Sequence, residues 1–194
     1  MINQKTMEDI LILVDENDNE IGLLDKLSVH QQGLLHRAFS VFVFNSNDEL
    51  LLQKRAEDKY HSGGLWSNTC CSHPRSGETT LFAVNRRLKE EMGIECAPEF
   101  KFSFIYKTNF ENGLTEYEYD HVYVGESDQI PSPDENEVQD WKYISLENLQ
   151  HEIKKNPENF SEWLKICLPE IIKYVNEDTD LSLKKELVSS KINF

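Results

Sequence analysis

The segment from residue 66 to residue 94 constrains the fold most, because it joins a turn-rich loop to a helix with a clear apolar face. In its second half, apolar residues recur at three- and four-residue intervals and predict the buried side of an amphipathic helix: Leu81, Val84, Leu88 and Met92. Thr79 or Thr80 can cap the start of this helix, and Gly93 can adopt the left-handed conformation just past its end. The segment therefore predicts a loop–helix unit packed on a core.

The polar face of the same helix carries residues that are typical of a functional site. Arg87 and Glu91 are four residues apart and therefore lie together on the helix surface. The preceding loop holds two adjacent cysteines, Cys70 and Cys71, followed by His73. A loop with Cys and His beside a helix with Arg and Glu indicates a functional site. The alternative is a solvated helix face beside inert core cysteines.

Strands and helices are interleaved along the rest of the chain. Apolar runs and alternation predict strands at residues 10–14, 21–27, 39–44, 49–55, 100–110, 115–124 and 140–144. Helices are predicted at 145–155 and 159–167, the second ending at Pro169, after an acidic loop at 131–137. The polar tail 176–194 is predicted to form a loosely held helix. No repeat or long linker divides the 194 residues, so pattern alone predicts one mixed α/β domain over residues 1–194.

The net charge of −15 excludes several classes of partner. Only 20 Lys and Arg face 35 Asp and Glu, so the general field of the protein repels nucleic acid and anionic membranes. An anionic ligand must therefore be held by a local group of cations. No apolar run is long enough to span a bilayer, and residues 1–5 lack a signal-peptide pattern. Since the four cysteines form no disulfide framework, we expect a cytoplasmic protein with reduced thiols.

Acidic residues on the strand predicted at 115–124 indicate a metal site. Glu116 and Glu118 share one face of this strand, where two carboxylates cost free energy unless a cation or a proton neutralises them. Three histidines would complete a nitrogen- and oxygen-rich set suited to a divalent ion rather than to a closed structural zinc site: His30, His36 and His73. Spacing alone does not show that these five residues converge, and scattered histidines with solvated strand acids are the alternative.

The helix and the residues before it resemble a known motif. Five residues stand at the spacings of the Nudix box, the loop–helix element with which that superfamily holds a metal–diphosphate unit: Glu78, Arg86, Glu90, Glu91 and Gly93. Two positions depart from the box. Ser72 replaces its first Gly, and Arg87 replaces the Glu that follows the Arg in the hydrolases. This variant box, with Cys71-Ser72-His73-Pro74 before it, resembles type I isopentenyl-diphosphate isomerase over about residues 11–163.

The resemblance implies the Nudix fold, a mixed β-sheet sandwiched between α-helices. Its core is expected at about residues 34–166, with the strand region 10–33 contributing to the site and the polar tail 176–194 outside the core. The substrate implied is a small isoprenoid diphosphate. We expect no nucleic-acid or membrane partner, and either a monomer or a weak homodimer.

The same resemblance implies two divalent ions. The five His and Glu residues named above are expected to hold one ion, which can be Mn²⁺, Zn²⁺ or Mg²⁺. Glu91 of the modified box is expected to help hold Mg²⁺ together with the substrate diphosphate, since Mg²⁺ prefers one or two carboxylates with phosphate oxygens and waters. Four cations are expected to bind the diphosphate: Lys26, Arg55, Lys59 and Arg87.

The reaction implied is a 1,3-allylic proton shift from isopentenyl diphosphate to dimethylallyl diphosphate. It needs an acid and a base on opposite sides of the carbon skeleton, in a site that excludes water. By resemblance, Cys71 and Glu118 form this pair, Tyr106 supports the glutamate, and the indole of Trp163 faces the carbocation. Which of the pair delivers the first proton stays open. Positive surroundings are expected to lower the pKa of the Cys71 thiol.

The adjacent cysteines are expected to face opposite sides of the loop. If residues 69–73 are extended, Cys71 and His73 point the same way, and Cys70 points into packing. Two other functions stay open. One is a Mg²⁺-dependent Nudix hydrolase of a nucleoside diphosphate derivative, against which Arg87 argues. The other is a metal-dependent binding or regulatory module without catalysis.

Overall fold

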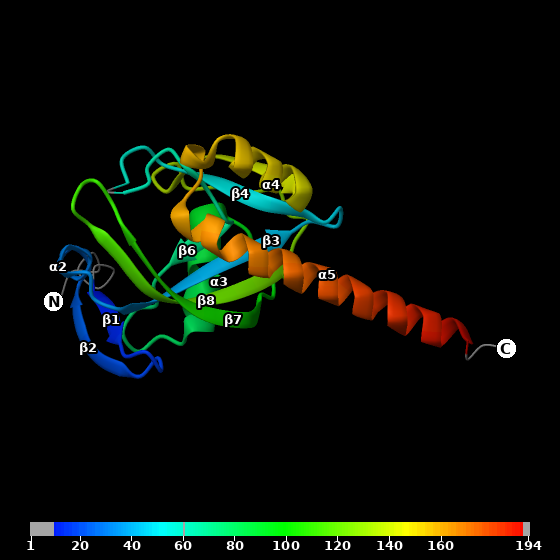
Figure 1. Cartoon of the computed structure of the whole chain (residues 1–194), viewed down its shortest axis with the longest axis horizontal. Coiled ribbons are helices and arrows are strands. Elements are labelled where there is room, and N and C mark those ends of the chain that lie inside the picture. The colour runs from blue at the N-terminus through cyan, green and yellow to red at the C-terminus, as the bar shows by residue number, and fades with distance from the viewer. Residues whose placement is uncertain (1–9, 60, 192–194) are drawn as a thin grey trace.

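A computed structural model describes residues 10–59 and 61–191 and shows strands layered between helices (Figure 1). The strands are β1 (Ile10–Val14), β2 (Glu20–Asp25), β3 (His36–Phe44), β4 (Glu49–Arg55), β5 (Trp66–Ser67), β6 (Cys70–Ser72), β7 (Glu99–Asn109), β8 (Thr115–Glu126) and β9 (Val138–Ser145). The helices are α2 (Lys26–Gln32), α3 (Thr80–Met92), α4 (Leu146–Lys155), the 3-10 helix η1 (Pro157–Asn159) and α5 (Glu162–Lys191). The predicted mixed sheet with helices on both faces is confirmed.

Strand β3 lies in the middle of the sheet and is covered on both faces. Phe39, Val41 and Val43 pack in the core cluster that includes α3. Phe42 and Phe44 point the other way, into the cluster that includes α4 and α5. Because both faces are buried, the sequence of β3 is almost continuously apolar instead of alternating.

The hairpin predicted from residues 39–44 and 49–55 closes only next to its turn. β3 and β4 pair antiparallel at Phe44 and Leu50. From there β3 runs beside β6 and, in parallel, beside β8, whereas β4 runs beside β9 and β5. The two strands therefore diverge, and residues of both line the cavity described below.

Helix α3 begins and ends where its caps predict. The Thr79 side chain accepts a hydrogen bond from the Phe82 N–H, and Gly93 has a φ of 66°. Three of the four residues assigned to its buried face are buried: Val84, Leu88 and Met92. The assignment of Leu81 is wrong, because this residue lies in the first turn, where it and Phe82 are exposed.

Two predicted boundaries are also wrong. The strand predicted at 21–27 ends at Asp25, because the Asp25 side chain caps α2 by accepting a hydrogen bond from the Ser28 N–H. The helix predicted to end at Pro169 continues to Lys191, since the buried Leu168 and Ile171 carry its apolar side past the proline.

The backbone of the tail is helical, as predicted, and α5 runs away from the sheet toward the C-terminus (Figure 1). Among the described helices, none combines the length and the apolar character needed to cross a bilayer. The predictions for residues 1–5 and for 192–194 lie outside the described residues.

Candidate active site

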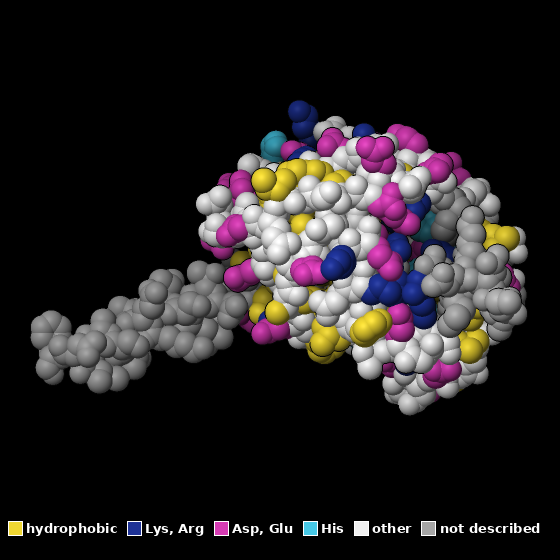
Figure 2. Space-filling view, turned by 180° about the vertical axis from the view of Figure 1, so that it is seen from behind, with side chains coloured by type: hydrophobic (Ala, Val, Ile, Leu, Met, Phe, Trp, Pro, Cys, Tyr) yellow, Lys and Arg dark blue, Asp and Glu magenta, His cyan; other side chains and the backbone are white. Residues whose placement is uncertain are grey.

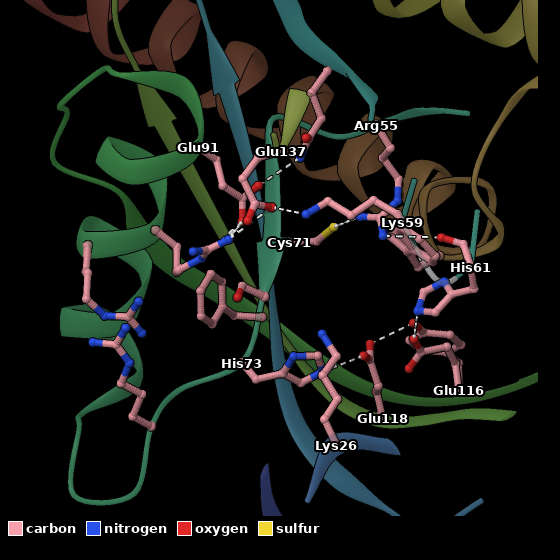
Figure 3. Close-up of a pocket in the computed structure, with 18 residues that line it drawn as sticks. Lys26, Arg55, Lys59, His61, Cys71, His73, Glu91, Glu116, Glu118 and Glu137 are labelled. Carbon is pink, nitrogen blue, oxygen red and sulfur yellow. Dashed lines mark hydrogen bonds and ion pairs between the residues drawn. The ribbon is translucent and has the colours of Figure 1, made fainter. Parts of the chain in front are cut away.

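A cavity of about 300 Å³ lies between the diverging strands (Figure 3). Seen from outside, Lys and Arg side chains gather around a hollow that shows His inside and Asp and Glu at its rim (Figure 2). Every predicted site residue lines this cavity except His30 and His36, which are fully buried. Because the net charge is −15, an anionic ligand would need cations gathered near its binding site, and the cavity supplies them.

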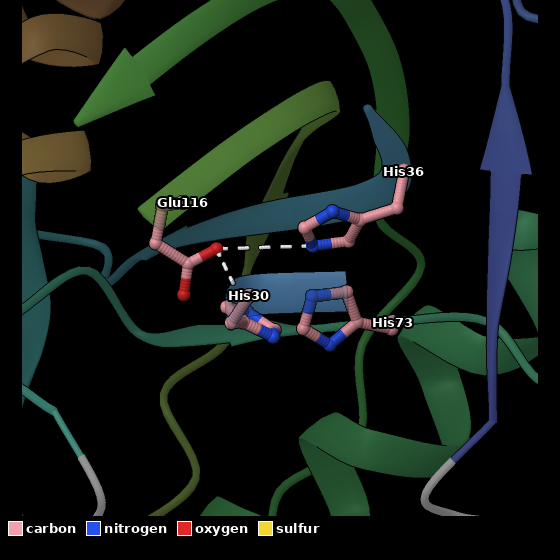
Figure 4. A group of neighbouring side chains, drawn as sticks. All are labelled: His30, His36, His73 and Glu116. Carbon is pink, nitrogen blue, oxygen red and sulfur yellow. Dashed lines mark ion pairs between the residues drawn. The ribbon is translucent and has the colours of Figure 1, made fainter. Parts of the chain in front are cut away.

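Three imidazoles and one carboxylate converge at one end of the cavity, which we call the histidine end (Figure 4). The ligand atoms of His30, His36, His73 and Glu116 all lie within 4.8 Å of one another. Glu116 Oε2 lies 3.1 Å from His30 Nε2 and 3.8 Å from His36 Nε2. Helix α2, strands β3 and β8 and the loop after β6 supply these side chains, so the fold brings together residues whose convergence spacing could not show.

This donor set fits a divalent cation. The Nδ1 atoms of His30 and His36 lie 2.6 and 2.9 Å from backbone carbonyl oxygens, so each Nδ1–H donates and, in the neutral ring that an ion would bind, each Nε2 directs a lone pair at the group. His36 Nε2 and Glu116 Oε2 are buried and make no hydrogen bond of acceptable geometry to a described residue. Burial lowers the pKa of His73 to about 4, so its imidazole is neutral and able to coordinate. A cation among these atoms would satisfy them.

A fourth histidine lies at the same carboxylate, and the sequence analysis did not single it out. His61, in the loop between β4 and β5, places its Nε2 2.6 Å from Glu116 Oε1. This loop is tight, since a Cβ at Gly63 would lie 2.4 Å from the backbone oxygen of Glu57. Burial would raise the pKa of Glu116, but interactions with His30 and His61 hold it well below its usual range. The carboxylate is therefore ionised.

The two cysteines of β6 face opposite sides, as predicted. β6 pairs antiparallel with β3, and Cys70 is fully buried in the core beneath α3, whereas Cys71 points into the cavity (Figure 3). Arg55 Nη1 lies 3.7 Å from Cys71 Sγ. The protein groups alone raise the pKa of Cys71 to about 12, because burial outweighs the opposing charge of Arg55; the lowering expected from a nearby ion stays a prediction. Cys71 is therefore a neutral thiol.

Glu118 lies across the cavity from Cys71 (Figure 3). The Tyr106 hydroxyl donates a 2.6 Å hydrogen bond to Glu118 Oε2, and His73 Nε2 lies 3.1 Å from Oε1. Burial raises the pKa of Tyr106 well above its usual value, so the phenol stays protonated and donates this hydrogen bond. Burial would also raise the pKa of Glu118, but the neighbouring imidazoles bring it below its usual value. Glu118 therefore lies at the edge of the four-residue group that could hold an ion, beside two of its histidines, His73 and, at 3.7 Å, His36.

Arg87 and Lys59 lie at the opposite end of the cavity, which we call the cation end. Both form ion pairs with carboxylates. Arg87 donates two hydrogen bonds to Glu91 Oε1, at 2.7 and 3.1 Å, and its Nη2 lies 3.3 Å from Glu137 Oε2. Lys59 also binds Glu137. Of the expected diphosphate cations, Arg87 is thus paired with the expected Mg²⁺ ligand Glu91, and Lys59 is paired with Glu137. Glu137 is a further residue of the site that the sequence analysis missed, since it had assigned this residue only to an acidic loop.

Lys26 stands apart from these cations, next to His73 and Glu118 (Figure 3). Burial lowers the pKa of its ammonium group, against the attraction of Glu116. The four predicted cations therefore surround the cavity instead of forming one patch.

The indole of Trp163 forms one wall of the cavity. This side chain is buried, and its Nε1–H donates to Asn68 Oδ1 at 3.0 Å. The guanidinium of Arg55 lies 5.2 Å from the ring centroid, and the His61 ring meets the indole edge-on at 5.9 Å. Arg55 therefore contacts both the Cys71 thiol and the Trp163 indole.

Comparison with known proteins first identifies the class of fold. The NUDIX domain family matches residues 34–164. Among solved structures, DR0079 from Deinococcus radiodurans has a TM-score of 0.64 and 22% identity, with 75% of this chain aligned to 89% of that chain. The MutT protein from Methanosarcina mazei Go1 has a TM-score of 0.60 and 16% identity, over 72% of this chain and 94% of that chain. The fold is that of the NUDIX domain.

Curated relatives narrow this class to one family. Isopentenyl-diphosphate Delta-isomerase 2 of Aromatoleum aromaticum is 52% identical over 86% of this chain and 88% of its own length. The isopentenyl-diphosphate Delta-isomerase of Pectobacterium atrosepticum is 48% identical over 84% of this chain and 92% of its own length. The chain therefore belongs to the isopentenyl-diphosphate Delta-isomerase family of NUDIX proteins, which confirms the resemblance found in the box and the cysteine loop.

Proposed function

We propose that this protein converts isopentenyl diphosphate to dimethylallyl diphosphate by a 1,3-allylic proton shift. The observation that carries the proposal is that a thiol, Cys71, and a carboxylate, Glu118, lie on two sides of one cavity that also gathers cations (Figure 3). The names of the relatives support the same substrate.

Cys71 and Glu118 are proposed to share the two proton transfers. One adds a proton to the terminal carbon of the alkene and leaves a tertiary carbocation. The other removes a proton from the carbon next to the one that bears the diphosphate, so the double bond moves and the composition stays the same. Cys71 is a neutral thiol, and Glu118 is an ionised carboxylate that accepts a hydrogen bond from Tyr106. In these states Cys71 holds the proton to give and Glu118 offers the site to accept one; the reverse order would need the proton on Glu118 and a Cys71 thiolate.

Trp163 is proposed to stabilise the carbocation. A desolvated cation over an indole face gains about 2 kcal/mol or more. Two features support this role. The ring is buried and held by Asn68, and the Arg55 guanidinium already lies over it. A buried wall also excludes the water that would trap the cation.

Two divalent ions belong to the proposal. The four-residue group at the histidine end, with Glu118 at its edge, would hold one ion, which can be Mn²⁺, Zn²⁺ or Mg²⁺. Glu91 would hold Mg²⁺ together with the substrate diphosphate. When bound, such ions supply positive charge that neutralises buried carboxylates and the diphosphate.

The diphosphate is proposed to bind through the four cations of the cavity: Lys26, Arg55, Lys59 and Arg87. Arg87 stands where the hydrolases carry a glutamate, so the box loses a metal ligand and gains a planar donor suited to phosphate oxygens. We therefore expect the box to bind the diphosphate without hydrolysing it.

Incubation of the protein with isopentenyl diphosphate and Mg²⁺ in deuterated water tests this function. The expected product is dimethylallyl diphosphate that carries deuterium in a methyl group, detected by NMR. Release of phosphate and pyrophosphate should stay at background. Rapid Mg²⁺-dependent release without labelled product would favour the hydrolase, and binding without either reaction would favour the binding module. Full turnover after chelation, with metal analysis showing no ion, would contradict the role of the ions.

A further inference from the structure

The two oxygens of the Glu116 carboxylate have different partners, because His61 contacts only one of them. Its Nε2 lies 2.6 Å from Glu116 Oε1, while Oε2 of the same carboxylate faces His30 Nε2 at 3.1 Å and His36 Nε2 at 3.8 Å. One oxygen is therefore held by the β4–β5 loop, and the other belongs to the group that could bind an ion. A carboxylate held in this way has a fixed orientation.

The His61 ring is itself fixed on several sides. It stacks on Phe110 with a centroid distance of 4.9 Å and an interplanar angle of 15°, and it meets Trp163 edge-on at 5.9 Å. Its Nδ1 lies 3.3 Å from the Ser62 hydroxyl, so we assign Nδ1 as the acceptor and Nε2–H as the donor to Glu116. The residue is only 8% exposed. Its orientation is therefore set before any ion binds.

We infer that His61 is a positioning residue for the metal site: it holds Glu116 Oε1, so that Oε2 stays directed at the three histidines. This inference rests on the proposed ion at the histidine end. It extends that proposal to a residue that neither the Nudix box nor the cysteine loop includes. Hydrogen bonds of this kind orient a ligand before the ion arrives and raise the affinity for it.

Direct coordination by His61 is the competing role. The four ligand atoms that lie within 4.8 Å of one another do not include a His61 nitrogen. Its Nε2–H is also already committed to Glu116 Oε1, at a short 2.6 Å. The geometry therefore favours a role through Glu116 over a direct contact with the ion.

Two crossed substitutions separate positioning from packing. His61→Phe keeps a ring that can stack on Phe110 and removes the donor. His61→Gln removes the ring and keeps an N–H that can reach Glu116 Oε1. The readout is the dissociation constant of Mn²⁺, measured by calorimetry on metal-stripped full-length protein without substrate. The exposed His151 on α4 provides the matched control, His151→Gln.

We expect His61→Phe to weaken Mn²⁺ binding by about 10–100-fold, the usual cost of losing such a partner, and His61→Gln to stay within about threefold of the wild type. The control should not change. Normal binding by His61→Phe with impaired binding by His61→Gln would overturn the inference and assign His61 to packing. Equal losses in both variants would also overturn it, in favour of direct coordination. Absence of Mn²⁺ binding in the wild type would remove the ion site itself, whereas failure of the deuterium experiment would leave these affinities untouched.

Discussion

The two ends of the cavity are built in opposite ways. At the histidine end, imidazole nitrogens and one carboxylate converge, and the buried His36 Nε2 and Glu116 Oε2 make no hydrogen bond of acceptable geometry to a described residue. At the cation end, Arg87 binds Glu91 and Glu137, and Lys59 binds Glu137. The first end directs lone pairs at a point that a cation would fill, whereas the charges of the second end already have partners.

This difference shows how an acidic protein can keep a site for a polyanion. Burying an unpaired cation costs much more than burying a paired one, so the carboxylates stabilise the cation end before substrate arrives. Under the proposed function, a diphosphate would displace these carboxylates from the cations and make Glu91 available to Mg²⁺. The histidine end needs no such exchange. We therefore expect one ion to bind without substrate and a second to bind only with it.

The largest effect is expected between the two ends, at Cys71. Cys71→Ala should lower kcat by about 10²–10⁴-fold, the usual contribution of a general acid or base, and leave ion and diphosphate binding unchanged. The matched control is Cys70→Ala, since this neighbour faces the core; it should keep most of its rate and lose some stability. Steady-state kinetics decide the matter. An active Cys71→Ala variant, or an inactive but folded Cys70→Ala variant, would show that the wrong cysteine has been assigned.

Glu116→Gln should weaken ion binding at the histidine end and leave the cation end unaffected. An amide is a neutral and weaker ligand than a carboxylate, so the Mn²⁺ affinity of the substrate-free protein should fall by at least the roughly 10–100-fold that loss of a ligand's hydrogen-bond partner costs. Binding of Mg²⁺-pyrophosphate, measured separately by calorimetry, should change little, because the carboxylates of the cation end are untouched. Unchanged Mn²⁺ affinity would contradict the assignment of the metal group.

The same substitution at the cation end, Glu137→Gln, should have a smaller and opposite effect. It removes a carboxylate that competes with the diphosphate for Lys59 and Arg87. A partly exposed ion pair contributes about 1 kcal/mol, so Mg²⁺-pyrophosphate should bind up to about fivefold more tightly. The Mn²⁺ affinity of the substrate-free protein should stay the same. Weaker pyrophosphate binding would mean that Glu137 holds the cations in place for the substrate instead of competing with it.

The smallest effect concerns the pair of Glu78 and Arg86 beside the cation end. Arg86 donates two hydrogen bonds to Glu78, at 2.8 and 2.9 Å, which makes its role structural. Burial would raise the pKa of Glu78, but these bonds and the Arg75 N–H hold it below the usual 4.5. Glu78→Gln should therefore lower the free energy of unfolding at pH 7 by about 1–2 kcal/mol and leave KM unchanged.

The pH dependence of this difference follows from the sign of the shift. A carboxylate with a lowered pKa in the folded protein stabilises above its unfolded pKa and loses that contribution as the pH falls through the folded value. The stability difference between wild type and Glu78→Gln should thus be full at pH 7 and shrink below about pH 4.5. Urea unfolding at low protein concentration measures it. A difference that stays constant down to pH 3 would show that the charge of Glu78 plays no part.

Local patterns in the sequence predicted much of this site. The caps of α3, the shared face of Glu116 and Glu118 and the opposite orientations of Cys70 and Cys71 all follow from the periods of helices and strands. The family resemblance then supplied the remaining predicted residues, and the fold places them in or beside one cavity. The predictions of caps and faces succeed because each depends on residues that are close together in the sequence.

The sequence did not predict the contacts that depend on irregular loops. His61 lies in the β4–β5 loop, which has no period from which the direction of a side chain can be inferred. Glu137 and Lys59 are 78 positions apart and meet only because β4 pairs with β9. The rise of the Cys71 pKa that burial causes could not be predicted for a related reason, since it depends on how deeply the fold buries the thiol.

The difference between the two ends is tested most directly by counting bound ions. Metal-stripped wild-type protein is titrated with Mn²⁺, first alone and then with saturating pyrophosphate, and the stoichiometry is measured by calorimetry and electron paramagnetic resonance. We predict one Mn²⁺ per chain without pyrophosphate and two with it. Two ions without pyrophosphate would show that the cation end is also open to metal before substrate arrives. No ion without pyrophosphate would contradict the account of the histidine end.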